Sequence, residues 1–476
     1  MPADSVSLVD RIHRARRIGT TFGRIYLGIR FNRVIARRLR PRDMAERWSQ
    51  FNRTSAESIY AVAVELGGLI LKGCQFIGSR SDVLPPEYVE VLSRLQDRVP
   101  ARPFRVVRKI VESEFNAKLG EIFDDFSRRP IASASLAQVH EARLHSGERV
   151  AVKVQYPEIE ALVHTDLSSL RGLFRAVGYL ERDFDLLPLI DELGQYIPLE
   201  LDFENEGANA EKIAGYFDDW PNVAIPQIHW RYTTRRVLVM EYMDGIKITD
   251  LIGLRAAGID VGRVAELLVE TFCEQILVRG LFHADPHPGN LLVQPGPDGA
   301  AKLVLLDFGL VKDLPPTFRK GIAAFAMSLL RADADAMGVA LLELGFETRD
   351  GRPDSLAKLA RFMLDAALLV QKQSFVDRDL LQEIGQSISE EIRSNPIVRV
   401  PSHIVLLGRV LGLLSGVNRS LESTVDLLNT ILPYATTANS STRTNSTPSP
   451  TSAAVPSAPG VSPERNEDGG PVLDER

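Results

Sequence analysis

The chain reads FHADPHPGN over residues 282–290 and, after an apolar run, DFG over residues 307–309. Phosphoryl transfer needs little covalent help from a protein, but it needs a positioned acid and metal ligands. Asp285 is the acid that can lie beside an acceptor hydroxyl, and Asn290, five residues later, carries an amide that can hold a metal ion. Asp307 follows a run that is typical of a buried strand and can grip a magnesium ion that bridges phosphates. The stretch therefore predicts a site for phosphoryl transfer.

The order of these residues is that of the catalytic loop and the metal-binding loop of kinases. A polar loop rich in His, Pro and Gly can precede a strand by chance, and a lone Asp-Phe-Gly carries little weight. The complete run at this spacing is far more specific. We therefore interpret residues 282–309 as the catalytic centre of a kinase-like domain.

The composition is that of an ordinary globular protein. The chain has 476 residues, of which 45% are apolar and 25% are charged, and its net charge is -6. This length allows a two-lobed domain with extensions, and this charge gives no drive toward nucleic acid, so we expect no nucleic-acid partner. Cys74 and Cys273 lie far apart and lack zinc spacing, which predicts a reducing, cytoplasmic compartment.

No apolar run reaches the roughly 18–20 residues of a membrane span. The closest run, residues 404–417, carries Arg409 and is more typical of a buried amphipathic helix. The segment at 1–10 is polar and no apolar core follows it, so we expect no secretory signal.

Residues 11–42 carry eleven arginines and no acid. Because Ile18, Phe22, Ile25 and Ile29 fall at helical spacing, we predict a basic amphipathic helix. Three interpretations stay open: a helix on a membrane surface, an organellar transit peptide, or a helix that packs one face on its own domain and leaves its arginines solvated. We expect this segment to make peripheral contact with an anionic membrane, on the inner face of the cell membrane.

A small β-rich lobe is predicted around Lys153. Residues 131–140 and 148–155 have the pattern of a hairpin with its turn near Ser146 and Gly147. The second run contains Val-Ala-Val-Lys, the strand whose lysine pairs with nucleotide phosphates in kinases. A protein kinase carries a glycine-rich loop upstream of this strand. Here the small residues AlaSerAlaSer at 132–135 take its place, and alanine permits less backbone approach to a phosphate than glycine does.

A helical insertion is predicted over roughly residues 159–217, and it contains an acidic run. A kinase needs one buried glutamate to hold its strand lysine, and either Glu206 or Glu200 is the candidate. Residues 237–245 are predicted as a strand that turns into the adenine-binding hinge between the lobes.

After Gly309 the chain is predicted to be helical to about Tyr434, and Leu314-Pro315-Pro316 leads almost directly into a helix. No Ala-Pro-Glu follows, so the activation loop and peptide platform of a protein kinase are missing. This argues against a peptide substrate. The segment from Thr436 is rich in Ser, Thr, Pro and Asn and is predicted to be disordered.

From about Glu65 to Leu432 the chain resembles the UbiB family of atypical kinases, also called ADCK or aarF-domain kinases. Three family motifs are matched, namely Lys-x-Gly-Gln of a helical extension, an alanine-rich loop and Glu-x-Asp; they fall on Lys72 and Gln75, on residues 132–135, and on Glu200 and Asp202. Ordinary kinases have neither the extension nor the alanine-rich loop, so the motifs are specific as a set.

The resemblance implies an α+β, protein-kinase-like fold with a small β-rich N-lobe, a helical C-lobe and an extension folded over the active site. There Lys72 and Gln75 would pair with Glu200 and Asp202 and block peptide substrates. It also implies ATP and Mg2+ as cofactors, weak ATPase activity, and a role in ubiquinone, other isoprenoid quinone or lipid metabolism at a membrane. The residues expected to act on this basis are catalytic Asp285 and Lys153; ATP-binding Ala132, Ser133, Ala134, Ser135, Val139, Lys153, Glu206, Met240, Glu241 and Met243; metal-binding Asn290 and Asp307; and, in the regulatory extension, Lys72, Gln75, Glu200 and Asp202.

Two features depart from the family. Cys74 stands where the motif has glycine, with Gly73 one position early, and its Cβ is expected to alter how the extension packs. Many bacterial members end in membrane-spanning helices, whereas this chain ends in a polar tail, so any membrane contact is expected to be peripheral.

Two other functions stay open. Small-molecule phosphotransferases of the aminoglycoside or choline kinase type share a His-x-Asp-x-x-x-x-Asn loop like residues 283–290, but the Lys72/Gln75 motif and the alanine-rich loop argue against them. A nucleotide-dependent regulator that transfers no phosphoryl group would retain the same site residues. The chain is divided into a basic segment at 1–45, a helical extension at 46–125, an N-lobe with a helical insertion at 126–243, a C-lobe at 244–434 and a disordered tail at 435–476.

Overall fold

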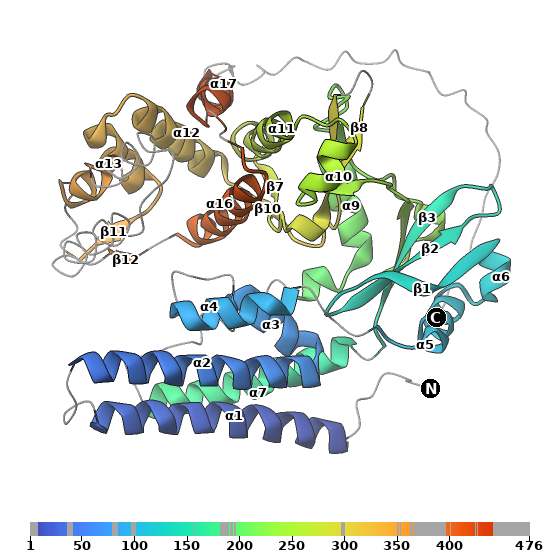
Figure 1. Ribbon diagram of the computed structural model, residues 1–476, viewed down its shortest axis with the longest axis horizontal. Coiled ribbons are helices and arrows are strands. Elements are labelled where there is room, and N and C mark those ends of the chain that lie inside the picture. The colour runs from blue at the N-terminus through green and yellow to red at the C-terminus, as the bar shows by residue number, and fades with distance from the viewer. Residues whose placement is uncertain are drawn as a thin grey trace, which may run out of the picture.

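The computed structural model describes the chain from residue 8 to residue 440, with gaps. The residues left out inside this range are 36–40, 79–83, 97–100, 158, 181–189, 191–193, 195–196, 297–299, 350–351, 353, 362–363, 365–396, 400, 424 and 426. The described chain forms a small lobe on one antiparallel sheet, a larger lobe rich in helices, and a layer of N-terminal helices (Figure 1). This is the two-lobed α+β arrangement with an extension that the sequence predicts.

A four-stranded antiparallel sheet in the order β1-β2-β3-β5 forms the small lobe. Its strands are β1 (Asp125–Ser133), β2 (Ala137–Arg143), β3 (Arg149–Gln155) and β5 (Val237–Glu241). Alternation along β3 buries Val150, Val152 and Val154 on one face, as period-2 patterning requires. The turn between β2 and β3 contains Gly147, whose φ of 91° is a conformation that favours glycine. The predicted hairpin is therefore present as β2 and β3, but its predicted first arm begins too early, because residues 131–133 belong to β1.

Two helices cover the buried face of this sheet: α5 (Phe104–Phe115) and α6 (Leu119–Ile122). Val107, Ile110 and Val111 of α5 lie in one apolar cluster with the valines of β3. Residues 104–122 therefore contribute to the small-lobe core, whereas the sequence-based boundary at 125 assigns them to the extension. The strand pattern alone could not reveal this, because α5 precedes the sheet and contacts it only in the folded chain.

The larger lobe holds a second sheet, in the order β4-β9-β8-β6, and a two-stranded ribbon, β7 with β10. Its strands are β4 (Val223–Ala224), β6 (Ile246–Lys247), β7 (Leu281–His283), β8 (Leu291–Pro295), β9 (Ala301–Leu305) and β10 (Val311–Asp313). The helices are α10 (Leu251–Ala256), α11 (Val261–Cys273), η3 (Glu274–Arg279), α12 (Pro316–Leu330), α13 (Ala334–Glu343), α16 (Ser402–Ser420) and α17 (Leu427–Ser440), with the short turn η4 (Pro288–Asn290). Helix α9 (Phe203–Ala214) and the short turn η2 (Trp230–Tyr232) contact β5 of the small lobe.

Two parts of the predicted C-terminal region differ from the structure. The stretch predicted to be helical to Tyr434 also contains the antiparallel strands β11 (Glu347–Thr348) and β12 (Ile397–Arg399). The predicted start of the disordered tail, at residue 435, is too early. Helix α17 continues to Ser440, and Ala435 is completely buried. Residues 441–476 lie outside the described residues.

The extension is a layer of helices that includes the first helix of the predicted insertion. Its members are α1 (Leu8–Ile35), α2 (Pro41–Leu66), α3 (Gly68–Gly78), α4 (Pro86–Leu92), η1 (Ser93–Gln96) and α7 (Ile159–Leu180). Leu69 of α3, Leu92 of α4 and Val163 of α7 belong to one apolar cluster. The first helix of the predicted insertion, α7, therefore packs on the extension, beside α1 and α3 (Figure 1). The end of the predicted insertion forms α9, which contacts β5 instead.

The predicted basic helix exists, but its expected membrane face turns inward. Ile18 is 1% exposed, and Phe22 makes an edge-on contact with Phe174 of α7 at 5.7 Å between ring centroids. Arg14 is also buried and pairs with the carboxylate of Asp166 on α7. The expectation that Ile18 and Phe22 enter a membrane is therefore wrong, because they complete the core of the extension. No helix among the residues that the structure describes is long and apolar enough to cross a membrane.

Candidate active site

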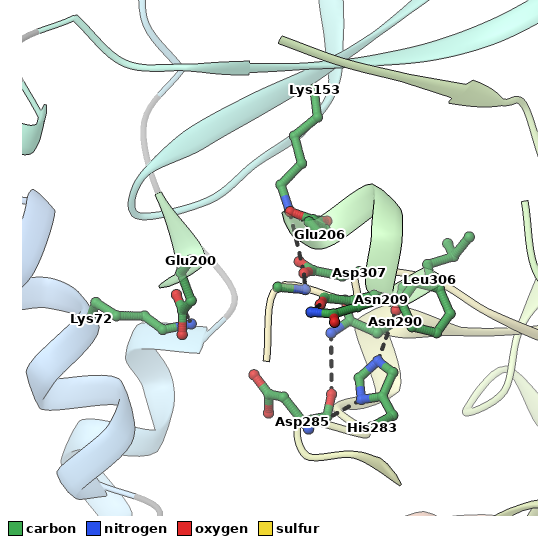
Figure 2. Close-up of polar contacts among 12 residues, drawn as sticks. Lys72, Lys153, Glu200, Glu206, Asn209, His283, Asp285, Asn290, Leu306 and Asp307 are labelled. Carbon is green, nitrogen blue, oxygen red and sulfur yellow. Dashed lines mark hydrogen bonds and ion pairs between the residues drawn. The ribbon is translucent and has the colours of Figure 1, made fainter. Parts of the chain in front are cut away.

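Lys153 and Glu206 form the buried centre of the site (Figure 2). Lys153 Nζ lies 2.7 Å from Glu206 Oε1 and 3.2 Å from Asp307 Oδ1. The helix that carries Glu206 begins at Asp202, whose carboxylate accepts the N–H groups of Glu204 and Asn205 and so caps α9. Of the two candidates for the partner of the strand lysine, Glu206 makes the contact.

The charges at this centre depend on one another. Burial lowers the pKa of Lys153, but the carboxylates of Asp307 and Glu206 outweigh it and the pKa is raised. Burial raises the pKa of Glu206 to about 7 even though Lys153 opposes the shift. The pKa of Asp307 lies well below its usual range, because Lys153 and Lys72 overcome the cost of burying its charge. Asp307 is therefore ionised and able to accept a cation.

The Asp-Phe-Gly segment is held in a strained conformation. Asp307 has a φ of 59°, which non-glycine residues seldom adopt, and its Oδ1 accepts the N–H of Gly309 at 3.3 Å. Asn209 donates from Nδ2 to the carbonyl of Phe308 at 3.3 Å and is itself buried. Sequence reasoning missed Asn209; the signal was its position three residues after Glu206, which places both on one face of α9.

The catalytic loop is organised by His283, which is fully buried. The N–H of Asp285 donates to His283 Nδ1 at 3.1 Å, so the ring carries its proton on Nε2 and donates it to the carbonyl of Leu306 at 3.0 Å. Asn290 donates from Nδ2 to the carbonyl of Asp285 at 3.3 Å, and its own carbonyl accepts the N–H of Leu306 at 2.9 Å. These bonds tie the loop at 285–290 to the end of β9, immediately before Asp307.

The side chain of Asp285 contacts a residue that sequence reasoning did not assign to the site. Arg409 on α16 lies 2.8 Å from Asp285 Oδ1, and its side chain is only 7% exposed. Burial raises the pKa of Asp285, but Arg409 and Lys72 overcome this and the pKa is lowered. The available signal was the single arginine inside the apolar run at 404–417.

The extension reaches the site through the ion pair of Lys72 Nζ with Glu200 Oε2, at 2.9 Å (Figure 2). Burial lowers the pKa of Lys72, but the negative charges of Glu200 and Asp285 outweigh the effect of burial, so the pKa is raised. The expected pairing of Gln75 and Asp202 is absent and that expectation is wrong. Gln75 donates to the carbonyl of Leu95 at 2.8 Å, and Asp202 is used as the cap of α9.

Cys74, which departs from the family motif, points into the core of the extension. It is 8% exposed and lies in the same apolar cluster as Leu69 and Leu71. Burial raises the pKa of this thiol to about 12, so it is an inert packing residue at neutral pH.

The alanine-rich loop begins inside β1, which ends at Ser133, so Ala132 and Ser133 still pair with β2. The N–H of Ala134 donates to the carbonyl of Ala137 at 2.8 Å, and Ser135 is buried below the exposed Ala132 and Ala134. On the neighbouring strands Val139 pairs with Lys153. At the predicted hinge Met240 is buried at the end of β5, followed by exposed Glu241 and half-buried Met243. The nucleotide contacts of these residues stay predictions.

Asp307 and Asn290 offer hard oxygen ligands, a carboxylate and an amide, which suit Mg2+. Across the described ranges no group of three or more His, Cys, Asp or Glu could hold a metal ion by itself. Mg2+ in phosphate-transfer sites is usually held by one or two protein oxygens, by phosphate oxygens and by water. The residues fit that mode of binding.

Comparisons with known proteins agree with this geometry. Residues 94–340 match the model of the ABC1 atypical kinase-like domain. The chain is 34% identical over 385 residues to AarF domain-containing protein kinase 1 of Xenopus laevis, covering 78% of this chain and 72% of that protein. It is 33% identical over 404 residues to the chloroplastic protein ACTIVITY OF BC1 COMPLEX KINASE 8 of Arabidopsis thaliana, covering 78% of this chain and 52% of that protein.

A solved structure shares the fold. Rv3197 of Mycobacterium tuberculosis, determined in complex with erythromycin, matches with a TM-score of 0.57 over 81% of this chain and 97% of that chain. The two sequences are 24% identical, so the likeness concerns the fold alone. Together with the matched domain it confirms the predicted kinase-like α+β fold.

Proposed function

Because the chain belongs to the ABC1 atypical kinase-like family, which confirms the resemblance inferred from its motifs, we propose that it binds magnesium-ATP and transfers a phosphoryl group to a small lipid-like acceptor. The observation that carries this proposal is the cluster of Lys153, Glu206 and Asp307, with Asp285 on the adjoining loop. The named kinases among its relatives support a kinase-like activity in general. The family match also favours this class over aminoglycoside or choline kinases.

Each residue has a distinct part in the proposed reaction. Lys153, oriented by Glu206, would hold the nucleotide phosphates. Asp307 and Asn290 would hold Mg2+, which when bound neutralises charge on the transferred phosphoryl group. Asp285 would orient the acceptor hydroxyl and accept its proton. The hydrogen bonds of His283 fix the backbone of Asp285 for that task.

The surroundings of Asp285 support an acceptor other than a peptide. Directly after the Asp-Phe-Gly segment, β10 pairs with β7, and the N–H of Leu314 donates to the carbonyl of Gly280 at 2.7 Å. The chain then enters α12 at Pro316, without an intervening activation loop. The extension adds Lys72 and Glu200 on the side of Asp285. A quinone precursor or another lipid is our proposed acceptor, supported by the name of the Arabidopsis relative, which refers to the BC1 complex.

The proposal is tested by nucleotide binding and ATP turnover in wild type, Asp307→Asn and Asp285→Asn, with and without quinone-precursor mimics. Asp307→Asn should bind nucleotide less tightly when magnesium is present and unchanged when magnesium is absent. Asp285→Asn should bind nucleotide like wild type and turn it over roughly a hundredfold more slowly, the usual scale for a general base. If Asp307→Asn binds and hydrolyses ATP like wild type, the site assignment is wrong.

A further inference from the structure

Six large apolar side chains stand exposed on helix α1. Leu27, which is 66% exposed, follows Val9 by 18 residues, or about five helical turns, so both point in the same direction. Ile12, Phe31 and Val34 fall within about 60° of this direction, and Leu8 lies at the edge of the same face. We call this set the α1 stripe, and its members are Leu8, Val9, Ile12, Leu27, Phe31 and Val34, each 59–76% exposed.

The opposite face of α1 is fixed to the protein by polar bonds. Arg14 pairs with Asp166 and donates to the carbonyl of Leu66 at 2.6 Å. That carbonyl is accessible because α2 ends there, at Gly67 and Gly68, whose φ values of 59° and 55° favour glycine. A buried pair of this kind costs roughly 3–5 kcal/mol to break. The helix therefore cannot roll to bury its apolar stripe.

The charges of helix α1 are almost all positive. Helix α1 contains seven arginines and a single acid, Asp10, and no acid follows in the helix. Arg16, Arg24 and Arg30 are exposed between and beside the two ends of the stripe. Apolar side chains mixed with arginines on one exposed helix face are suited to an anionic lipid surface. A second copy of the same face would bring arginines against arginines, which disfavours self-association.

The position of α1 leaves this face accessible. The helix packs on α2 and α7 and forms the outer edge of the extension, on the far side of α2 from the two lobes (Figure 1). Its 28 residues span about 42 Å, so both ends of the stripe can meet one flat surface.

We infer that α1 lies flat on an anionic bilayer, with the α1 stripe at the boundary between headgroups and acyl chains and the exposed arginines beside the lipid headgroups. The surface differs from the one that the sequence suggested, because Ile18 and Phe22 pack inward and Leu27 and Phe31 face out. This inference goes beyond the proposed function, since it needs neither ATP nor an acceptor.

The test is co-sedimentation of the full chain with phosphatidylcholine vesicles that contain or lack phosphatidylglycerol, without nucleotide. The triple variant Leu27→Gln/Phe31→Gln/Val34→Gln should lose roughly tenfold or more of its binding to anionic vesicles. A matched control replaces three exposed apolar residues on other helices and should bind like wild type; its changes are Ile252→Gln, Val339→Gln and Leu411→Gln. If the stripe variant pellets as well as wild type, the inference is overturned.

The charge contribution is measured separately with Arg16→Gln/Arg24→Gln. This variant should bind anionic vesicles more weakly and with a shallower dependence on salt, because exposed charges are screened. Equal binding of wild type to neutral and anionic vesicles would overturn the inference. Light scattering without lipid tests whether the stripe binds a second copy of the chain instead. If wild type is a dimer and the stripe variant is a monomer, the stripe is a dimer interface and the inference is overturned. Thermal unfolding checks folding, and Phe31→Gln alone replaces the triple variant if that variant does not fold.

Discussion

The guanidinium of Arg409 lies 2.8 Å from the carboxylate of Asp285, although 124 residues separate them in the chain. Arg409 belongs to α16, in the last part of the large lobe, and it meets the residue that we expect to orient the acceptor. The contact occupies Oδ1 of Asp285, so it fixes the rotation of the carboxylate and leaves Oδ2 for an acceptor hydroxyl. Arg409 thereby acts as a positioning residue through Asp285.

We predict that Arg409→Met slows ATP turnover at least tenfold while the nucleotide dissociation constant stays close to that of wild type. Turnover should change without a change in nucleotide affinity, because Arg409 contacts Asp285, whereas Lys153 and Glu206 are expected to orient the nucleotide. A double-mutant cycle sharpens the test: in an Asp285→Asn background, Arg409→Met should change turnover little further. Arg419→Met, an exposed arginine on the same helix, is the control. If Arg409→Met also loses nucleotide binding, Arg409 does not act only by positioning Asp285.

The contrast between Asp285 and Arg409 shows what the sequence can reveal. Asp285, Asn290 and Asp307 lie within 23 residues of one another, and a loop–strand–loop at that spacing can be recognised from chemistry alone. Likewise Lys153 lies on a strand whose alternation is plain. The contact with Arg409 depends on how α16 packs against the rest of the lobe, and no local pattern carries that information.

Helix α1 shows a second limit of sequence reasoning. Ile18 and Phe22 mark one apolar face and Leu27 and Phe31 mark the opposite one, so periodicity alone cannot choose which face is buried. The choice is made by Arg14, whose partner Asp166 lies 152 residues away. A buried ion pair between distant helices leaves no signature in a single sequence.

Replacing Ala134 by glycine is predicted to tighten ATP binding severalfold. The N–H of Ala134 donates to the carbonyl of Ala137, and the residue is exposed. Removing the Cβ lets the backbone approach a phosphate more closely. Nucleotide titration by calorimetry measures the change. Ser146→Gly, in the β2–β3 turn of the same lobe, is the control and should bind like wild type.

An unchanged or weaker affinity in Ala134→Gly would argue that the loop does not cover the phosphates. Glycine also loosens the unbound loop, at a cost of about 0.5–1 kcal/mol. A thermal unfolding curve for each variant separates that loss of stability from a change in the binding contact itself.

His140 is predicted to make the folded protein less stable as the pH falls below about 6.5. Its ring is fully buried on β2, bonded to Ser127 and Gln138, and burial lowers its pKa. The unfolded chain binds a proton at its ordinary pKa near 6.5, so between the lowered pKa and 6.5 the unfolded state holds more protons. Stability therefore rises with pH through this window, with a slope of at most about 1.4 kcal/mol per pH unit.

Urea unfolding at several pH values between 5 and 8 measures this slope. His140→Gln should show a smaller loss of stability below pH 6.5 than wild type, since all other titrating groups are common to both proteins. His145→Gln, at an exposed position in the next turn, should keep the wild-type slope. If the free energy of unfolding has the same pH dependence in wild type and His140→Gln, the buried ring does not cause the loss of stability below pH 6.5.

The last prediction concerns what keeps the extension on the site. The pair Lys72–Glu200 is partly exposed, with 21% and 11% of the two side chains accessible, and such pairs contribute on the order of 1 kcal/mol. By contrast Leu69 and Leu71 of the same helix are 0% and 2% exposed, and burying each stabilises the extension by about 1.5–3 kcal/mol. Apolar packing therefore holds α3 in place, and the ion pair adjusts the charge beside Asp285.

We accordingly predict that Lys72→Met leaves α3 docked, with amide hydrogen exchange over residues 68–78 close to that of wild type. Leu69→Ala should accelerate exchange there, because the cavity it leaves costs roughly 2–5 kcal/mol. Phosphorylation of added peptides should stay absent in Lys72→Met, because α3 would still lie beside Asp285. Fast exchange over α3 in Lys72→Met, or peptide phosphorylation by that variant, would instead make the ion pair the latch that holds the extension closed.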